Sequence, residues 1–149
     1  MDRFLNGNQE YQSSQAINII KAGQEVAKSQ SMFIREEIFE EVRQNYFPQL
    51  PCRKTCIWVC TKEAIPFWWK TLGASKQKIL KLNLTGSLYV ADQRHLIADT
   101  FRHDDFRAKA FEYWTGSDGI QLEDQEVLFE GIIDVLEEYS NVEEFTKNT

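Results

Sequence analysis

Asp124-Gln125-Glu126-Val127-Leu128-Phe129 decides the predicted fold, because two acidic residues stand directly before the apolar residues of a predicted strand. Asp124 and Glu126 are two residues apart, so on a strand their side chains point to the same side. Gly131 follows and predicts a turn or a bulge, after which Ile132 to Leu136 read as a second strand. The stretch therefore indicates a sheet with two carboxylates at the N-terminal end of one strand.

Helix and strand patterns alternate in the segment before this sheet. A row of apolar residues at every fourth position predicts a helix that begins at Ser31, its N-cap, and stops at Phe47, because Pro48 disfavours helical geometry in the residue before it. The other predicted elements are a strand at 55–60, a helix within 61–72 that becomes regular near Ile65 and stops at Gly73, a strand at 79–84, a return across Gly86 into a strand at 88–91, and a helix from about Asp105.

Both ends of the chain are polar. Phe4-Leu5 is consistent with a short strand, Gln9 to Ser14 with a loop, and residues 141–149 with a frayed tail. No internal repeat, low-complexity tract or interdomain linker interrupts the pattern between them. We therefore expect a single α+β domain over residues 1–149.

The composition is that of a globular chain, with 42% apolar and 13% aromatic residues among 149. No apolar run approaches the ~18 residues of a membrane span, and the N-terminus lacks the pattern of a secretory signal. We therefore expect a cytoplasmic protein that does not bind membranes. The net charge of −6 argues against nucleic acid as a partner, because tight phosphate binding requires clustered cations.

Three cysteines, Cys52, Cys56 and Cys60, are spaced by four residues. An odd number in a chain without a secretory signal predicts reduced thiols. The two histidines, His95 and His103, lie far away and without metal-ligand spacing. We expect buried thiols and no metal site.

Further motifs surround the acidic strand. The strand Arg53 to Val59 precedes an acid-alanine helix, Thr61 to Trp69, and Tyr113-Trp114-Thr115-Gly116 precedes the glutamate. Arg35-Glu36-Glu37 and Phe47-Pro48 complete the pattern. Together these segments, over about residues 35 to 136, resemble an ADP-ribosyltransferase-like domain of a poorly characterised bacterial family.

The resemblance implies a fold and an activity. The fold is a split, mostly antiparallel β-core flanked by helices. The activity is mono-ADP-ribosyl transfer from NAD to an unknown protein or other macromolecular acceptor, or NAD hydrolysis, in a toxin-like protein of a bacterium or phage. NAD is the substrate, and no metal is required. The acceptor and the oligomeric state are left open.

Roles for individual residues follow from the same resemblance. Glu126 accepts a hydrogen bond from the ribose 2-hydroxyl and stabilises the positive charge that develops on the sugar. Asp124 orients or deprotonates the acceptor nucleophile. The implied NAD-binding residues are Arg53 or Arg3 for the pyrophosphate and Trp58, Tyr113 or Trp114 for the nicotinamide ring. The hydroxyl position of the strand falls on Thr55 or is replaced by Cys56.

A second hypothesis comes from another class of protein. The chain retains the fold but acts as a catalytically inactive protein-binding module or inhibitor. The enzyme hypothesis requires Glu126, Asp124 and an arginine to converge on one cleft. The binding hypothesis requires an exposed apolar patch and no such cleft.

Overall fold

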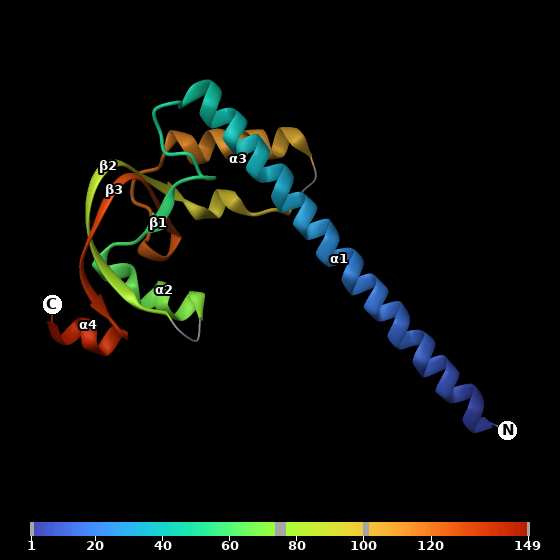
Figure 1. Ribbon diagram of the computed structural model, residues 1–149. Coiled ribbons are helices and arrows are strands. Elements are labelled where there is room, and N and C mark those ends of the chain that lie inside the picture. Colours follow the sequence, from blue (N-terminus) through green and yellow to red (C-terminus); the bar gives the residue numbers. More distant parts are fainter. Residues whose placement is uncertain (1, 74–76, 100–101, 149) are drawn as a thin grey trace.

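The computed structural model describes the backbone of residues 2–73, 77–99 and 102–148, and the side chains of residues 15–73, 77–99 and 102–147. The α+β class predicted from the sequence is confirmed (Figure 1). The elements, in chain order, are α1 (Asp2–Tyr46), β1 (Ile57–Val59), the 3-10 turn η1 (Lys62–Ala64), α2 (Ile65–Leu72), β2 (Ile79–Asp92), η2 (Gln93–Leu96), α3 (His103–Thr115), η3 (Leu122–Asp124), β3 (Gln125–Tyr139) and α4 (Val142–Asn148).

Helix α1 is much longer than its sequence pattern predicts. It is 45 residues long, and its N-terminal part projects away from the other elements (Figure 1). The strand predicted at Phe4-Leu5 and the loop predicted at Gln9 to Ser14 are wrong, since both segments are helical. Ser31 is not an N-cap but a buried residue in mid-helix. The predicted end is confirmed, because α1 stops at Tyr46, just before Phe47-Pro48.

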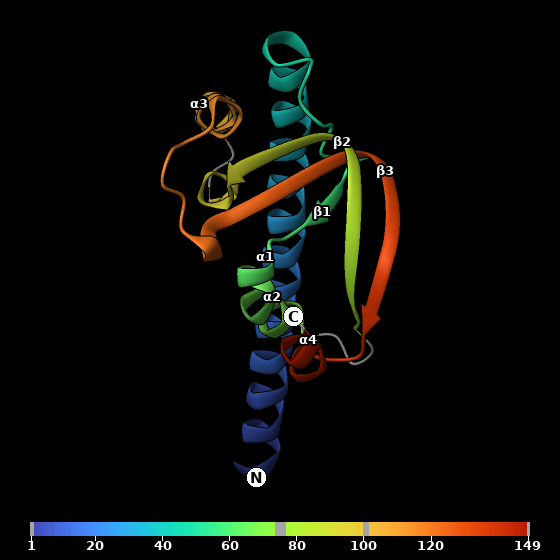
Figure 2. The same ribbon diagram turned by 90° about the vertical axis from the view of Figure 1, so that its left-hand side faces the viewer.

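The strands form one antiparallel sheet in the order β1-β3-β2, and not two sheets, within the described residues. The separate strands predicted at 79–84 and 88–91 are one continuous strand, and so are those at 127–129 and 132–136. Figure 2 shows β2 and β3 curving together along one side of the molecule. The irregularity in their pairing lies between Lys81 and Leu82, not at Gly131.

Two facing glycines make this continuous pairing possible. Gly86 pairs with Gly131, and a Cβ added at Gly86 would lie 2.3 Å from the carbonyl oxygen of Glu130. Gly131 has a φ of +154° and would place a Cβ 2.4 Å from the carbonyl oxygen of Thr85. Glycine allows both the close approach and the backbone angle. The two glycines therefore mark a close approach of the paired strands β2 and β3. The sequence predicted a chain reversal at Gly86 and a turn or bulge at Gly131.

The larger core lies between the C-terminal part of α1, helix α3 and one face of the sheet. Its fully buried residues come from all three: Ile38, Phe39 and Val42 of α1, Phe106, Ala110, Tyr113 and Trp114 of α3, and Ala91 and Leu128 of the sheet. The indole Nε1 of Trp114 donates to the carbonyl oxygen of Phe39 at 2.8 Å. This core fixes α1 and α3 over the N-terminal end of β3, which carries Glu126.

A smaller core closes the far end of the sheet. Ile79, Tyr139 and Phe145 are buried there, and Ile65 and Trp69 of α2 pack against them. The predicted fraying of residues 141–149 is wrong for the described part, because residues 142–148 form α4 and the Phe145 ring packs 5.3 Å from that of Tyr139. Phe145 and Val142 thus attach this short helix to the smaller core.

The alternating leucines of β2 do not have the buried face that their pattern predicts. Leu80 is 46% exposed, and Leu82 and Leu84 are only half-buried. In the part of the chain that is described, no helix combines the length and the apolar character needed to cross a membrane.

Candidate functional site

Arg53 lies at the centre of a polar cluster between α1, α3 and the sheet. The carbonyl oxygen of Cys52 accepts hydrogen bonds from the amides of Thr55 (3.1 Å) and Cys56 (2.8 Å), which folds residues 52–56 into a tight turn. This turn directs Arg53 inward, where its side chain is 6% exposed. Buried arginine is rare without acidic partners.

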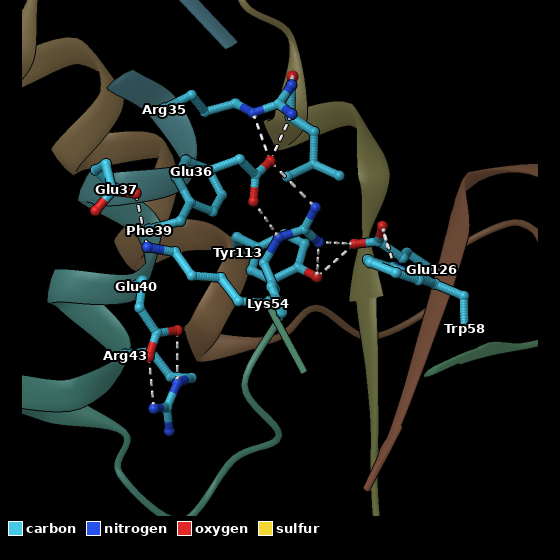
Figure 3. A network of polar contacts seen from close by, with 12 residues as sticks. Arg35, Glu36, Glu37, Phe39, Glu40, Arg43, Lys54, Trp58, Tyr113 and Glu126 are labelled. Atoms are coloured by element: carbon cyan, nitrogen blue, oxygen red, sulfur yellow. Dashed lines mark hydrogen bonds and ion pairs between the residues drawn. The ribbon is translucent and has the colours of Figure 1, made fainter. Parts of the chain in front are cut away.

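Three side chains from three elements surround the Arg53 guanidinium. Its Nε donates to Glu36 Oε2 at 3.1 Å, and its Nη1 donates to the Tyr113 hydroxyl at 2.7 Å and to Glu126 Oε2. Figure 3 shows Glu36, Tyr113 and Glu126 connected in this way. Glu36 comes from α1, Tyr113 from α3 and Glu126 from β3. Residues up to 90 positions apart in the sequence therefore meet at one guanidinium.

The two carboxylate oxygens of Glu126 have different surroundings. Oε2 accepts from buried donors, Arg53 and the Tyr113 hydroxyl, the latter at 2.5 Å. Oε1 accepts from the indole Nε1 of Trp58 at 2.8 Å. Trp58 is 55% exposed, whereas the Glu126 side chain is 12% exposed. The inner oxygen is thus fixed, and the outer oxygen lies beside a ring that faces solvent.

A second arginine extends the cluster along α1. Arg35 pairs with Glu36 Oε1 at 2.5 Å and also donates to the carbonyl oxygen of Leu96. Two guanidinium groups and two carboxylates, those of Glu36 and Glu126, therefore compensate one another's charge in a largely buried place. Such pairing is what allows ionised groups to persist away from water.

The pKa values of the cluster reflect this pairing. Burial alone would raise the pKa of Glu36, but hydrogen bonds and charge from Arg53 and Arg35 outweigh it and hold that pKa below its ordinary value. Burial alone would lower the pKa of Arg53, yet Tyr113, Glu126 and Glu36 raise it. Burial, and then the neighbouring Glu126 carboxylate, raise the pKa of the Tyr113 hydroxyl. The tyrosine therefore stays a neutral donor, and the arginine stays charged.

The cluster unites four of the predicted site residues, Glu126, Arg53, Trp58 and Tyr113, but not the others. Asp124 was expected to point to the same side as Glu126, but it precedes the strand in η3 and pairs with Arg94 at 3.5 Å. Strand alternation does not apply to a residue outside the strand.

Three further predicted residues also lie elsewhere. Thr55 is exposed in the turn before β1 and is not on the strand. Trp114 is 1% exposed in the core, so its ring presents no surface to a ligand. Arg3 is in helix α1, where a strand was expected, and its side chain lies outside the described residues.

The comparison with protein families gives one match. The family described as Protein of unknown function (DUF2441) matches residues 1–141. The chain belongs to this family. Among curated proteins, the comparison finds no match. The match includes every element of the cluster, from Arg35 of α1 to Glu126 of β3.

Sequence reasoning missed Glu36 and Arg35 as members of the cluster. Both are in the quoted Arg35-Glu36-Glu37 motif, but three consecutive charged residues on a helix are ordinarily solvated. Glu37, the next residue, does follow that rule, because its side chain is 50% exposed and pairs with Lys54. The i, i+3 relation between Glu36 and the fully buried Phe39 was the available signal, since such residues share a helix face.

Two hollows of the described surface lie away from Glu126. One, of about 220 Å³, is lined by Lys62, Glu63, Pro66, Val142, Phe145 and Thr146. Another, of about 460 Å³, is lined by His95, Phe111, Glu112, Thr115, Gly116 and Ser117. Glu126 lines neither hollow, and the Trp58 indole donates to its outer oxygen, Oε1, at 2.8 Å.

Proposed function

We propose that the chain is an NAD-dependent mono-ADP-ribosyltransferase, or an NAD glycohydrolase, with Glu126 as its catalytic carboxylate and an unknown macromolecule as the acceptor. The observation that carries the proposal is the state of Glu126. One of its oxygens is fixed by Arg53 and Tyr113, and the other is held only by the half-exposed Trp58. A carboxylate preorganised in this way is suited to stabilise a cation that forms next to it.

The chemistry uses the outer oxygen of Glu126, Oε1. The ribose 2-hydroxyl donates to Glu126 Oε1 in place of the Trp58 indole. The bond between C1 of the ribose and the nicotinamide nitrogen breaks, and its electron pair leaves with neutral nicotinamide. The acceptor nucleophile, or water, forms the new bond to C1 and loses a proton. The positive charge on the sugar is greatest in the transition state, so a negative Glu126 lowers that barrier.

Arg53 has a different role in this proposal from the one that the resemblance implies. Its Nε and Nη1 donors already serve Glu36, Tyr113 and Glu126. A guanidinium used in this way orients Glu126 and has few donors left for a pyrophosphate. Trp58, which is 55% exposed, is the aromatic side chain that can stack on nicotinamide, whereas the Tyr113 ring is buried.

Labelled NAD tests the proposal directly. The native chain is incubated with tagged NAD and a cell lysate, and compared with Glu126→Gln, which keeps the shape and removes the charge. Label transfer or nicotinamide release by the native chain, reduced at least about 100-fold in the variant, is the expected result. Glu123→Gln, at an exposed acid just before β3, is the matched control and should retain activity.

The alternative is a protein-binding module without catalysis. It is favoured by two observations: Glu126 lines neither of the two hollows described above, and α1 and the sheet carry many exposed apolar side chains. If the native chain neither binds NAD, as measured by calorimetry, nor releases nicotinamide, the enzyme proposal fails and the binding module replaces it.

A further inference from the structure

Strand β2 is a long edge of the sheet. It has 14 residues, and among the described residues it pairs with β3 alone. Every second residue of an edge strand directs its backbone N–H and C=O groups away from the sheet. Residues Leu80 to Val90 are all exposed or half-buried. Proteins usually shorten, charge or cover such an edge, because it is a template for pairing with another strand.

One face of this edge strand is apolar throughout. Leu80, Leu82, Leu84, Leu88 and Val90 alternate along β2 and therefore point to the same side. Leu80 is 46% exposed, Leu88 52% and Val90 37%. The opposite face carries Tyr89 and Ala91, which belong to the large core. The leucine face is therefore the face of β2 away from α1 and α3, here termed the outer face, and it is open on β2 although the β3 partners of Leu88 and Val90, Phe129 and Val127, are buried.

The neighbouring strand extends the outer face. Val135 pairs with Leu82, and Ile133 pairs with Leu84, so all four side chains lie on one side. Val135 is 58% exposed and Ile133 is 37% exposed. A contiguous apolar surface beside an unpaired strand edge is the signature of an interface.

We propose that β2 pairs antiparallel with β2 of a second copy of this chain, about a two-fold axis, to give a continuous six-stranded sheet. An edge strand is self-complementary in this arrangement, because a two-fold axis turns its own backbone donors and acceptors toward those of the copy. The outer faces of the two copies then join into one apolar surface.

The sequence of β2 favours one register. If the two-fold axis passes through Thr85, the segment Leu80 to Val90 of one copy pairs antiparallel with the same segment of the other copy. Leu82 then lies opposite Leu88 of the copy, and Leu80 lies opposite Val90, so apolar side chains meet in each pair. Eleven paired residues supply about ten backbone hydrogen bonds, the number of direct bonds in a typical stable interface.

Another exposed apolar surface among the described residues, on α1, is a poorer partner for this edge. The helix N–H and C=O groups are already paired within α1. A helix laid on the outer face would cover leucines but would leave the backbone groups of the β2 edge unpaired. An added strand can pair the backbone groups of the edge and also extend the apolar face. In β2 of a second copy, apolar residues fall opposite the apolar residues of this edge.

The test uses charge exchange across the axis in the full chain. Leu82→Glu and Leu88→Lys are each expected to weaken dimerisation at least about 10-fold, because each places charges in an apolar pair. Combined in one chain, they place opposite charges across the axis twice and are expected to restore the dimer. The combination Leu82→Lys with Leu88→Lys places like charges opposite and is expected to stay monomeric. Light scattering after gel filtration measures mass, and circular dichroism checks folding.

Two controls keep the proposal open to refutation. Asn83→Lys, on the other face of the same strand, should leave the dimer intact. Ile19→Lys tests α1 as the rival interface, since Ile19 is 72% exposed there. The proposal is overturned by a native chain that is monomeric at every concentration, by dissociation through Ile19→Lys, or by a double variant, Leu82→Glu with Leu88→Lys, that dimerises as weakly as either single variant.

Discussion

The two halves of helix α1 contain the same kinds of residue and have opposite surroundings. Ile20 and Ile38 are 18 residues apart, which is five helical turns, so they lie on the same face. Ile38 is 3% exposed in the large core, and Ile20 is 59% exposed. Between residues 15 and 30, only Ala27 is even half-buried. One continuous helix is therefore docked at its C-terminal end and exposed along residues 15–30, apart from Ala27. We term this segment the arm.

The difference separates two sources of helical structure. The docked half is held by tertiary packing, with Phe39 and Val42 completely buried. The arm depends on intrinsic helix propensity, and isolated helices of its length are only marginally stable in water. The network around Arg53 is built on the docked half because only that half has a fixed position relative to α3 and the sheet.

The largest expected effect compares the two isoleucines. Ile38→Ala should lower the free energy of unfolding by about 3 kcal/mol, because it removes buried methyl groups and leaves a cavity. Ile20→Ala should change it by less than about 0.5 kcal/mol. Urea titration of the two variants measures both. A loss of more than about 1 kcal/mol in Ile20→Ala would mean that the arm is packed in solution and would remove the contrast.

The next effect compares two neighbouring glutamates in the docked half. Glu36→Gln leaves the buried Arg53 without one of its charged partners and should cost about 2 kcal/mol at neutral pH. Glu37→Gln breaks only the exposed pair with Lys54 and should cost less than about 0.5 kcal/mol. Equal losses would show that the inward position of Glu36 has no energetic consequence.

The pH dependence of the Glu36 effect has a definite sign. The folded pKa of Glu36 is lower than its ordinary value of 4.5, so the carboxylate contributes its full stabilisation above that pH. The contribution is lost as the pH falls through the lower folded value. The difference in unfolding free energy between the native chain and Glu36→Gln should therefore be constant above about pH 5 and shrink below pH 4.5. A difference that grows on acidification would contradict the pairing with Arg53.

The smallest effect concerns the arm alone. Gly23 is in mid-helix, with nothing within 4 Å of an added Cβ. Gly23→Ala should favour the local helix by about 1 kcal/mol and slow the amide exchange of residues 15–30, with little change in global unfolding. Gly73, the left-handed cap of α2 at φ +55°, supplies the control of opposite sign. Gly73→Ala should destabilise the protein by about 1 kcal/mol.

Part of the candidate site was predictable from the sequence. Glu126 at the strand mouth, Arg53 before β1 and Tyr113 on α3 were each selected, and the structure brings them together. Asp124 was expected to point to the side of Glu126 because strand alternation was applied to a residue that lies one position before the strand. Glu36 was missed because its inward direction depends on how α1 docks, which no local pattern contains.

The sequence by itself determined the α+β class, the apolar row of the docked half of α1, the stop before Pro48 and the left-handed cap at Gly73. These follow from periodicity and backbone preference, which act over a few residues. Only the tertiary structure decided that Gly86 and Gly131 face each other in a continuous ladder and that one charged residue of Arg35-Glu36-Glu37 turns toward Arg53. It also decided that the leucines of β2 are exposed or half-buried. The physical reason is that burial and ion pairing are set by residues distant in sequence, whose positions no local pattern specifies.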